Sequence, residues 1–183
     1  VTLVGRVKSD SLPMPERPDR TVRMKLRRER GPLFYLEFQW QLWNFLNENP
    51  ADILVSNDLD TLCPNYTVAR KRSIPLVYDA HEIFTEVPEL IHRRFKQRIW
   101  QRLEQNLLPH IKHMITVNDS IANWYGEKYG VQPVVVRNIP DKPSTVIRRT
   151  REDVGWPLDK KIIVLQGAGI NIDRGSEELV QAM

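Results

Sequence analysis

Short apolar runs alternate along this chain with longer segments in which apolar residues return every three or four positions. A short uninterrupted apolar run is typical of a strand in a parallel sheet, and the wider spacing is typical of a helix with one buried face. The runs predict strands at residues 1–4, 53–56, 76–78, 114–117, 134–136 and 162–165. The spaced segments predict helices at residues 31–46, 63–70, 88–107 and 120–129. This alternation predicts an α/β fold, with a Rossmann-like parallel sheet and helices on both faces.

Two of the predicted helices carry further signals. The segment Asn118-Asp119-Ser120 has the residue types that cap helix N-termini, and it precedes the predicted helix at 120–129. Gly130 is placed to end that helix. In residues 88–107 the apolar positions fall on one stripe, which we expect to be buried. These positions are Leu90, Ile91, Phe95, Ile99, Trp100, Leu103 and Leu107.

The composition changes near residue 140, where Pro, Lys, Arg and Asp replace most apolar residues. The sequence therefore predicts a first domain at residues 1–140, a linker at 141–160 and the beginning of a second Rossmann-like domain at 161–183. In this last part a strand, a glycine-rich loop and the start of a helix form the first half of a βαβ unit. Because residues 1–4 already have the pattern of a strand, we expect the chain to be a fragment.

Composition places the chain among soluble globular proteins. It has 183 residues and a formal net charge of +4. No segment approaches the roughly 18 apolar residues of a membrane span, and no leader resembles a signal peptide. The single cysteine, Cys63, cannot form an internal disulfide. We expect a reducing, cytoplasmic environment and a packing role for Cys63.

The glycine-rich segment 167–175 is the first candidate for chemistry. A loop between a strand and a helix N-terminus offers free backbone N–H groups to a phosphate, and Arg174 could bind a diphosphate there. The dinucleotide fingerprint would need glycine at Ile172, and the P-loop Gly-Lys-Ser/Thr is missing. A diphosphate site using Gly167, Gly169 and Arg174 and a plain tight turn are equally consistent with the spacing.

A second candidate is His81, which directly follows the apolar run at 76–78 and the residues Asp79 and Ala80. Ligands in open α/β sheets gather at the carboxyl ends of the strands, so His81 is placed where catalytic residues are found. After the run at 53–56, Asp58 and Asp60 could chelate a divalent cation, but helix capping by Asp60 explains them as well, and we favour it.

The other histidines, His92, His110 and His113, lack an acidic third ligand nearby and are interpreted as surface residues.

A basic cluster near the start of the chain precedes a group of aromatic residues. Cations beside aromatics can hold a protein on an anionic membrane, and a nucleic-acid groove would use the same charges. The aromatic residues fall at helical spacing, so we expect them in the core. The cluster is Arg20, Arg23, Lys25, Arg27, Arg28 and Arg30, and the aromatics are Phe34, Tyr35, Phe38, Trp40 and Trp43.

Several segments, in this order and spacing, closely resemble bacterial glycosyltransferases of family 4, the group 1 transferases of the GT-B fold. They include GRVKSDSLPMPERPDRTVRMKL, ADILVSNDLDTLCPN, LVYDAHEIFTEVPEL, ITVNDSIANWYGEKYGV, VVVRNIP and VLQGAGINIDRGSEELVQAM. The resemblance implies that the chain holds most of the N-terminal, acceptor-side domain and the beginning of the donor-side domain. The first strand and glycine loop of the family are not in this sequence.

The resemblance also implies roles for individual residues. His81 would contact the donor sugar or the reacting centre, and Arg174, with Gly167 and Gly169, would bind the donor diphosphate. Ala168 stands where many relatives carry a second arginine, which puts more of that binding on Arg174. Candidate acceptor-side residues are Asn57, Asp58, Glu82, Asn118 and Asn138.

The function implied is sugar transfer from a nucleotide-sugar donor to a glycan or lipid-linked acceptor, with retention, in cell-surface polysaccharide synthesis. The enzyme would be of the hexosyl type and need no cofactor or metal. It would be cytoplasmic, on the inner face of the membrane, with no nucleic-acid partner. The fragment alone is expected to be inactive. The alternative is a non-enzymatic module that binds a membrane or nucleic acid through the arginine cluster at residues 20–30.

Overall fold

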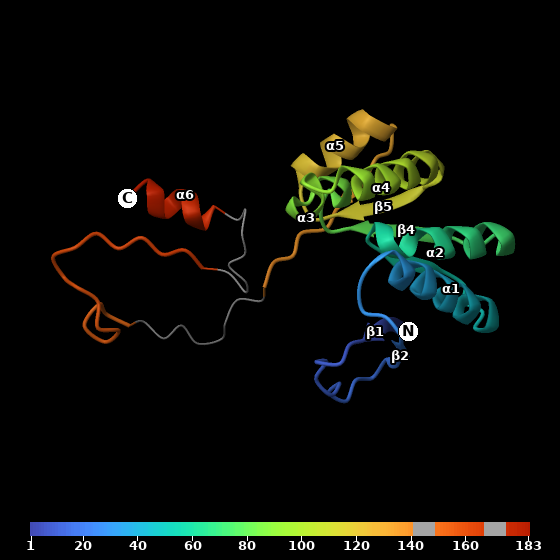
Figure 1. Cartoon of the computed structure of the whole chain (residues 1–183), viewed down its shortest axis with the longest axis horizontal. Helices are drawn as coiled ribbons and strands as arrows, with labels where there is room; N and C mark the ends of the chain where they lie inside the picture. Colours follow the sequence, from blue (N-terminus) through green and yellow to red (C-terminus); the bar gives the residue numbers. More distant parts are fainter. Residues whose placement is uncertain (141–148, 167–174) are drawn as a thin grey trace. The chain divides into compact units, whose positions relative to one another are not determined.

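The computed structural model describes residues 1–140, 149–166 and 175–183. It separates into two compact units, residues 1–138 and 139–183, and each is described by itself (Figure 1). The predicted boundaries near residues 140 and 160 stay a prediction.

The first unit is built on a four-stranded sheet in which all neighbouring strands are parallel. Its order follows the sequence: β3 (Leu54–Asn57), β4 (Leu76–Ala80), β5 (His113–Thr116) and β6 (Val134–Val135). In the register, Asn57 lies opposite Asp79 and Ala80 opposite Thr116, so the carboxyl ends of these strands meet at one edge. The predicted Rossmann-like parallel sheet is confirmed.

Helices cover both sides of this sheet (Figure 1). They are α1 (Pro32–Glu48), α2 (Leu59–Arg72), α3 (Pro88–Ile91), α4 (Arg94–Leu107) and α5 (Asp119–Tyr129), with 3₁₀ turns η1 (Phe84–Glu86) and η2 (Leu108–His110). The capping signals act as expected in α5. The Ile121 backbone N–H donates to Asn118 Oδ1 at 2.9 Å, and Gly130 ends the helix with a positive φ of 69°.

The core lies between the sheet and the apolar faces of the helices. On α1 a buried residue returns every fourth position, at Phe34, Phe38, Leu42 and Leu46. Tyr78 of β4 is fully buried in the same cluster. The expectation that the aromatics of α1 belong to the core is therefore confirmed for Phe34 and Phe38.

A second, two-stranded parallel sheet joins β1 (Thr2–Val7) to β2 (Arg20–Lys25). The strand β2 was not predicted, because its arginines favour an exposed basic segment. Its alternation is nevertheless that of a strand, since Met24 is buried while its neighbour Lys25 is exposed. Half of the basic cluster is thus built into a sheet.

The predicted helix at 88–107 is wrong as one continuous element. The chain leaves the helical conformation at Arg93, with φ −122° and ψ 57°, so that α3 and α4 are separate. The predicted buried stripe is also broken: Phe95 is 78% exposed and Ile99 51% exposed. Trp100, Leu103 and Leu107 still pack against the core.

One predicted strand, at residues 162–165 in the second unit, is wrong. Residues 161–166 form no strand, and the side chains of Ile163 and Val164 are exposed. A parallel strand needs a hydrogen-bonded neighbour, and none pairs with this segment in the described ranges. The predicted helix start is present as α6 (Ser176–Gln181).

Candidate functional site

The candidate site lies at the carboxyl edge of the four-stranded sheet. Asp58 directly follows β3, His81 directly follows β4, and Asn118 lies two residues beyond β5. Because these strands are parallel and in register, the residues after them emerge on the same side of the sheet.

His81 is held by Asp79 of its own strand, β4, and by Asp58, which directly follows the neighbouring strand β3. Its Nε2 lies 3.2 Å from Asp79 Oδ2, and its backbone N–H donates to Asp58 Oδ1 at 3.2 Å. A carboxylate can only accept a hydrogen bond, so an ionised Asp79 holds the imidazole with the proton on Nε2. In the neutral ring, Nδ1 then carries the free lone pair. The side chain is 43% exposed, so solutes can reach it.

Asp58 has a strained backbone at the turn between β3 and α2. Its φ is +57°, a region that a residue with a side chain rarely adopts. The turn is held because the Asp58 backbone N–H donates to the Asp79 carbonyl at 2.9 Å. Burial raises the pKa of Asp58, while the hydrogen bond and the charge of His81 act in the opposite direction. Such strain is typical of functional turns.

Asp60 lies in the first turn of α2, next to β1 and α1. Burial, and secondarily the charge of Asp58, raise its pKa from the ordinary 3.8 to about 6, although Arg6 acts against this shift. Gln39 donates a hydrogen bond to the Asp60 carbonyl. The favoured capping by Asp60 is wrong in detail: Asp58 is at the N-cap, and its side chain caps no backbone N–H. In the described ranges, no cluster of acidic, histidine or cysteine side chains could hold a metal ion.

A buried acid behind His81 was missed in the sequence. Glu104 of α4 is fully buried and accepts hydrogen bonds from Thr85 Oγ1 at 3.2 Å, Tyr125 Oη at 3.4 Å and Tyr129 Oη at 2.5 Å. Its Oε2 also lies 3.8 Å from Lys128 Nζ. Burial raises the pKa of Glu104, and these partners oppose that shift. An acid inside the apolar stripe of α4, between Leu103 and Leu107, is the signal that could have revealed it.

This network reaches the loop that carries His81. The hydroxyl of Tyr125 lies 3.4 Å from the carbonyl oxygen of Glu82, the residue after His81. Glu82 is exposed and is not without an interaction partner. Helices α4 and α5 are thereby tied to the start of the segment that follows β4.

The remaining predicted site residues are placed differently. Asn57 ends β3 and is exposed, with its carbonyl accepting from Thr61 Oγ1 at 2.8 Å. The side chain of Asn118 is engaged in capping α5, and Asn138 is exposed at the end of the first unit. The predicted diphosphate-binding residues Gly167, Gly169 and Arg174 lie outside the described residues. His92, His110 and His113 are exposed, as predicted.

The basic cluster precedes, along the chain, an exposed apolar stripe on α1. Arg27, Arg28 and Arg30 are exposed in the segment before this helix. The expectation of a core position is wrong for Trp40 and Trp43, which are 64% and 40% exposed. Together with Leu33 and Leu36 they form the α1 stripe, spaced three and four residues apart. Among the helices that the structure describes, none is long and apolar enough to cross a bilayer.

Comparison with known families gives one match. Residues 1–141 match the family model described as a glycosyl transferase 4-like domain. The match therefore covers the first unit with both of its sheets and the edge that carries His81. No curated protein matches the sequence.

Proposed function

The chain belongs to the family of glycosyl transferase 4-like domains, and we propose that its first unit is the acceptor-side domain of a retaining, hexosyl-type glycosyltransferase. The donor is a nucleotide sugar, and the acceptor is a glycan or a lipid-linked glycan in cell-surface polysaccharide synthesis. The observation that carries the proposal is His81, held by Asp58 and Asp79 at the carboxyl edge of the sheet, where ligands bind in this class of fold.

In the proposed reaction, the bond between the sugar C1 and the diphosphate oxygen breaks, and a bond from the acceptor oxygen to C1 forms on the same face. The leaving diphosphate takes the bonding electrons and then the proton of the acceptor hydroxyl. The imidazole of His81 orients the two groups by hydrogen bonding, which is a positioning and electrostatic contribution. Asp79 supports this role because it fixes the ring of His81.

The diphosphate is proposed to bind at Gly167, Gly169 and Arg174. Backbone N–H groups in a loop before a helix, together with a guanidinium, suit the charge that develops on the leaving group. We propose no metal in this reaction. Asp58, one of the two acids that could chelate a cation, already accepts a hydrogen bond from the His81 backbone, which favours a structural role.

The proposal is tested by screening nucleotide-sugar donors for binding to the protein. A panel of UDP-, GDP- and ADP-sugars is tested by thermal shift, and product formation by mass spectrometry. We expect one nucleotide sugar to raise the melting temperature, and Arg174→Ala to abolish that rise. Arg149→Ala, which removes the same charge from an exposed position outside the glycine-rich segment, is the matched control. If no nucleotide sugar changes the melting temperature and no transfer is detected, the proposal is wrong.

We also propose that the protein is cytoplasmic and rests on the inner face of the membrane. The exposed α1 stripe begins three residues after the exposed Arg30, and apolar side chains that follow a basic segment suit an anionic lipid surface. Each cation near such a surface contributes about 1 kcal/mol of binding. A lipid-linked acceptor would be presented at the same surface.

Membrane contact is tested by co-sedimentation with vesicles of phosphatidylglycerol and of phosphatidylcholine. We expect binding to the anionic vesicles only, and a clear loss of binding for the double variant Trp40→Ser with Trp43→Ser. Trp156→Ser is the control, because Trp156 is similarly exposed, at 45%, in the second unit. Equal binding of the double variant and the control would contradict the proposed surface.

A further inference from the structure

A cavity of about 630 Å³ lies at the opposite edge of the sheet from His81. It is bounded by the end of α2, the start of β4, and the segment from η2 to the start of β5. Its volume is in the range of small-molecule sites. Leu76, which lines it, begins β4, and His81 follows the end of that strand. About 13 Å of strand separate the two edges, so the cavity is distinct from the candidate transfer site.

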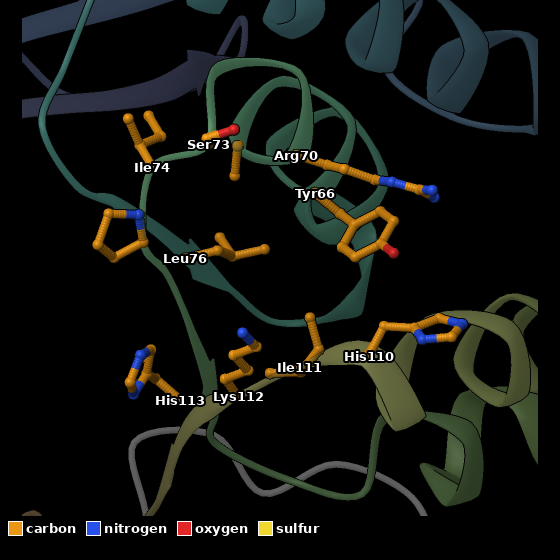
Figure 2. A pocket seen from close by; sticks show the side chains of 11 residues that line it. Tyr66, Arg70, Ser73, Ile74, Leu76, His110, Ile111, Lys112 and His113 are labelled. Atoms are coloured by element: carbon orange, nitrogen blue, oxygen red, sulfur yellow. The ribbon is translucent and has the colours of Figure 1, made fainter.

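The floor of the cavity is apolar. Ala69, Leu76 and Ile111 are buried, and Ile74 is half-buried beside them. In Figure 2, Leu76 and Ile111 point into the space between α2 and the segment that leads to β5. An apolar group of a ligand placed on this floor would remove apolar surface from water.

The rim of the cavity is basic. Arg70 of α2 and Lys112, just before β5, both line it, and His110 and His113 stand beside Lys112. The Lys112 ammonium points into the space between the two sides (Figure 2). None of the lining residues is acidic, and in the described part of the chain neither Arg70 nor Lys112 forms an ion pair. Their positive charges are therefore available to an anion.

The end of α2 does not cancel this charge. A helix C-terminus carries a partial negative charge on its last carbonyl groups. Here the Ser73 backbone N–H donates to the carbonyls of Ala69 and Arg70, and the Ile74 N–H donates to that of Ala69 at 3.1 Å. These two carbonyl groups already have partners, and the full positive charges of Arg70 and Lys112 outweigh the partial negative charge of the helix end, so the rim favours an anionic ligand.

An aromatic pair closes one side of the cavity. The rings of Tyr66 and His110 are stacked, with centroids 6.3 Å apart and planes 28° from parallel. The pair joins α2 to η2 and offers a flat surface beside the basic rim (Figure 2). A planar apolar group could rest against it.

We propose that this cavity binds a small organic phosphate. The phosphate meets Lys112, whose ammonium points into the cavity, while the charge of Arg70 on the rim adds to the attraction, and the apolar body of the ligand lies on the floor near Leu76. The phosphate could belong to a soluble metabolite or to a lipid headgroup, since the chemistry at the rim is the same. Binding at this edge does not depend on sugar transfer at the other.

The test uses phenyl phosphate as the probe, with inorganic phosphate and phenol for comparison. Titration of the 183-residue chain is followed by ¹H–¹⁵N NMR at low ionic strength. We expect saturable binding of phenyl phosphate, with shifts concentrated at Ile74, Ile111 and Lys112, weaker binding of inorganic phosphate and none of phenol. Shifts spread over the arginine cluster at residues 20–30 instead would overturn the proposal, as would the lack of saturable binding.

Paired substitutions test which positive charges are needed for phosphate binding. Arg70→Gln with Lys112→Gln is expected to weaken binding of phenyl phosphate at least tenfold. Lys71→Gln with Lys8→Gln is the matched control, because it removes the same charge from exposed residues that do not line the cavity. All four residues are exposed, and single variants of Arg70 and Lys112 keep the test available if the double variant unfolds. If both double variants lost the same affinity for phenyl phosphate, the proposed site would be refuted.

Vesicles separate the two sources of phosphate. If vesicles of phosphatidic acid compete with phenyl phosphate for the wild-type chain, the ligand is a lipid headgroup. If the vesicles leave the phenyl phosphate shifts unchanged, the ligand is a soluble phosphate. Either result supports the proposed site, provided that the substitution of Arg70 and Lys112 removes the binding.

Discussion

His81 and its neighbours show how two carboxylates can hold a histidine in place at the edge of a sheet. Asp79 fixes the ring, and Asp58 accepts from the backbone N–H of His81 while its own backbone is held at a positive φ. Neither contact depends on a flexible surface loop, because Asp79 lies inside β4 and Asp58 is hydrogen-bonded to it. The histidine is thus orientated before any ligand binds, which is the condition for efficient positioning.

Asp60 gives a prediction for the pH dependence of stability. Its pKa is raised from 3.8 to about 6 in the folded chain, mainly by burial. Between about pH 4 and pH 6 the folded chain keeps this proton and the unfolded chain loses it. The contribution of Asp60 to the free energy of unfolding is therefore fully present below about pH 4 and is lost as the pH rises through 6.

We expect the wild-type chain to lose about 1–3 kcal/mol more than Asp60→Asn when the pH is raised from 4 to 7. The measurement is urea unfolding at both pH values. Asp52→Asn serves as the control, because Asp52 is exposed. A wild-type chain and an Asp60→Asn variant with the same pH dependence would contradict the assigned shift.

Among the helices, α5 and α4 show what the sequence pattern reveals and what it hides. Both ends of α5 were predicted, because a capping side chain and a glycine act on the neighbouring backbone alone. The break between α3 and α4 was not, since the helical spacing of apolar residues continues through Arg93 although its backbone is not helical. The strand β2 was also missed, because the arginines in it obscure the alternation that buries Met24.

The N-cap of α5 can be tested directly. Asn118→Ala removes the acceptor for the Ile121 N–H, and we expect the free energy of unfolding to fall by about 1 kcal/mol. Ser120→Ala, two residues further on and equally exposed, should change it by less than about 0.5 kcal/mol. Thermal or urea unfolding measures both, and equal effects would show that Asn118 does not stabilise the helix.

Glu104 ties α4 to α5 and to η1. Glu104→Ala leaves the hydroxyls of Thr85, Tyr125 and Tyr129 without this partner, so we expect a loss of about 2–4 kcal/mol in the free energy of unfolding. The control is Gln105→Ala, at the exposed next position of the same helix. A loss below about 1 kcal/mol for Glu104→Ala would mean that the buried network contributes little.

The molecule as a whole combines a well-defined first unit with a second unit whose described part has one short helix, α6. The sequence predicted the parallel sheet of the first unit because strand and helix patterns are strong there. It also placed His81 at the carboxyl edge of the sheet, since that position follows from strand direction alone. The contacts of His81 could not be predicted, because Asp58 and Asp79 meet it through the register of two strands.

The most direct test is the turnover number of the His81→Ala variant. It is measured with the protein's own donor and compared with the turnover number of His92→Ala. Both histidines are exposed, so neither substitution should affect folding, and only His81 lies at the carboxyl edge of the sheet. We predict that His81→Ala lowers kcat by at least about a hundredfold, while the donor still raises the melting temperature. Turnover by His81→Ala equal to that of His92→Ala would contradict the central claim that His81 takes part in the transfer.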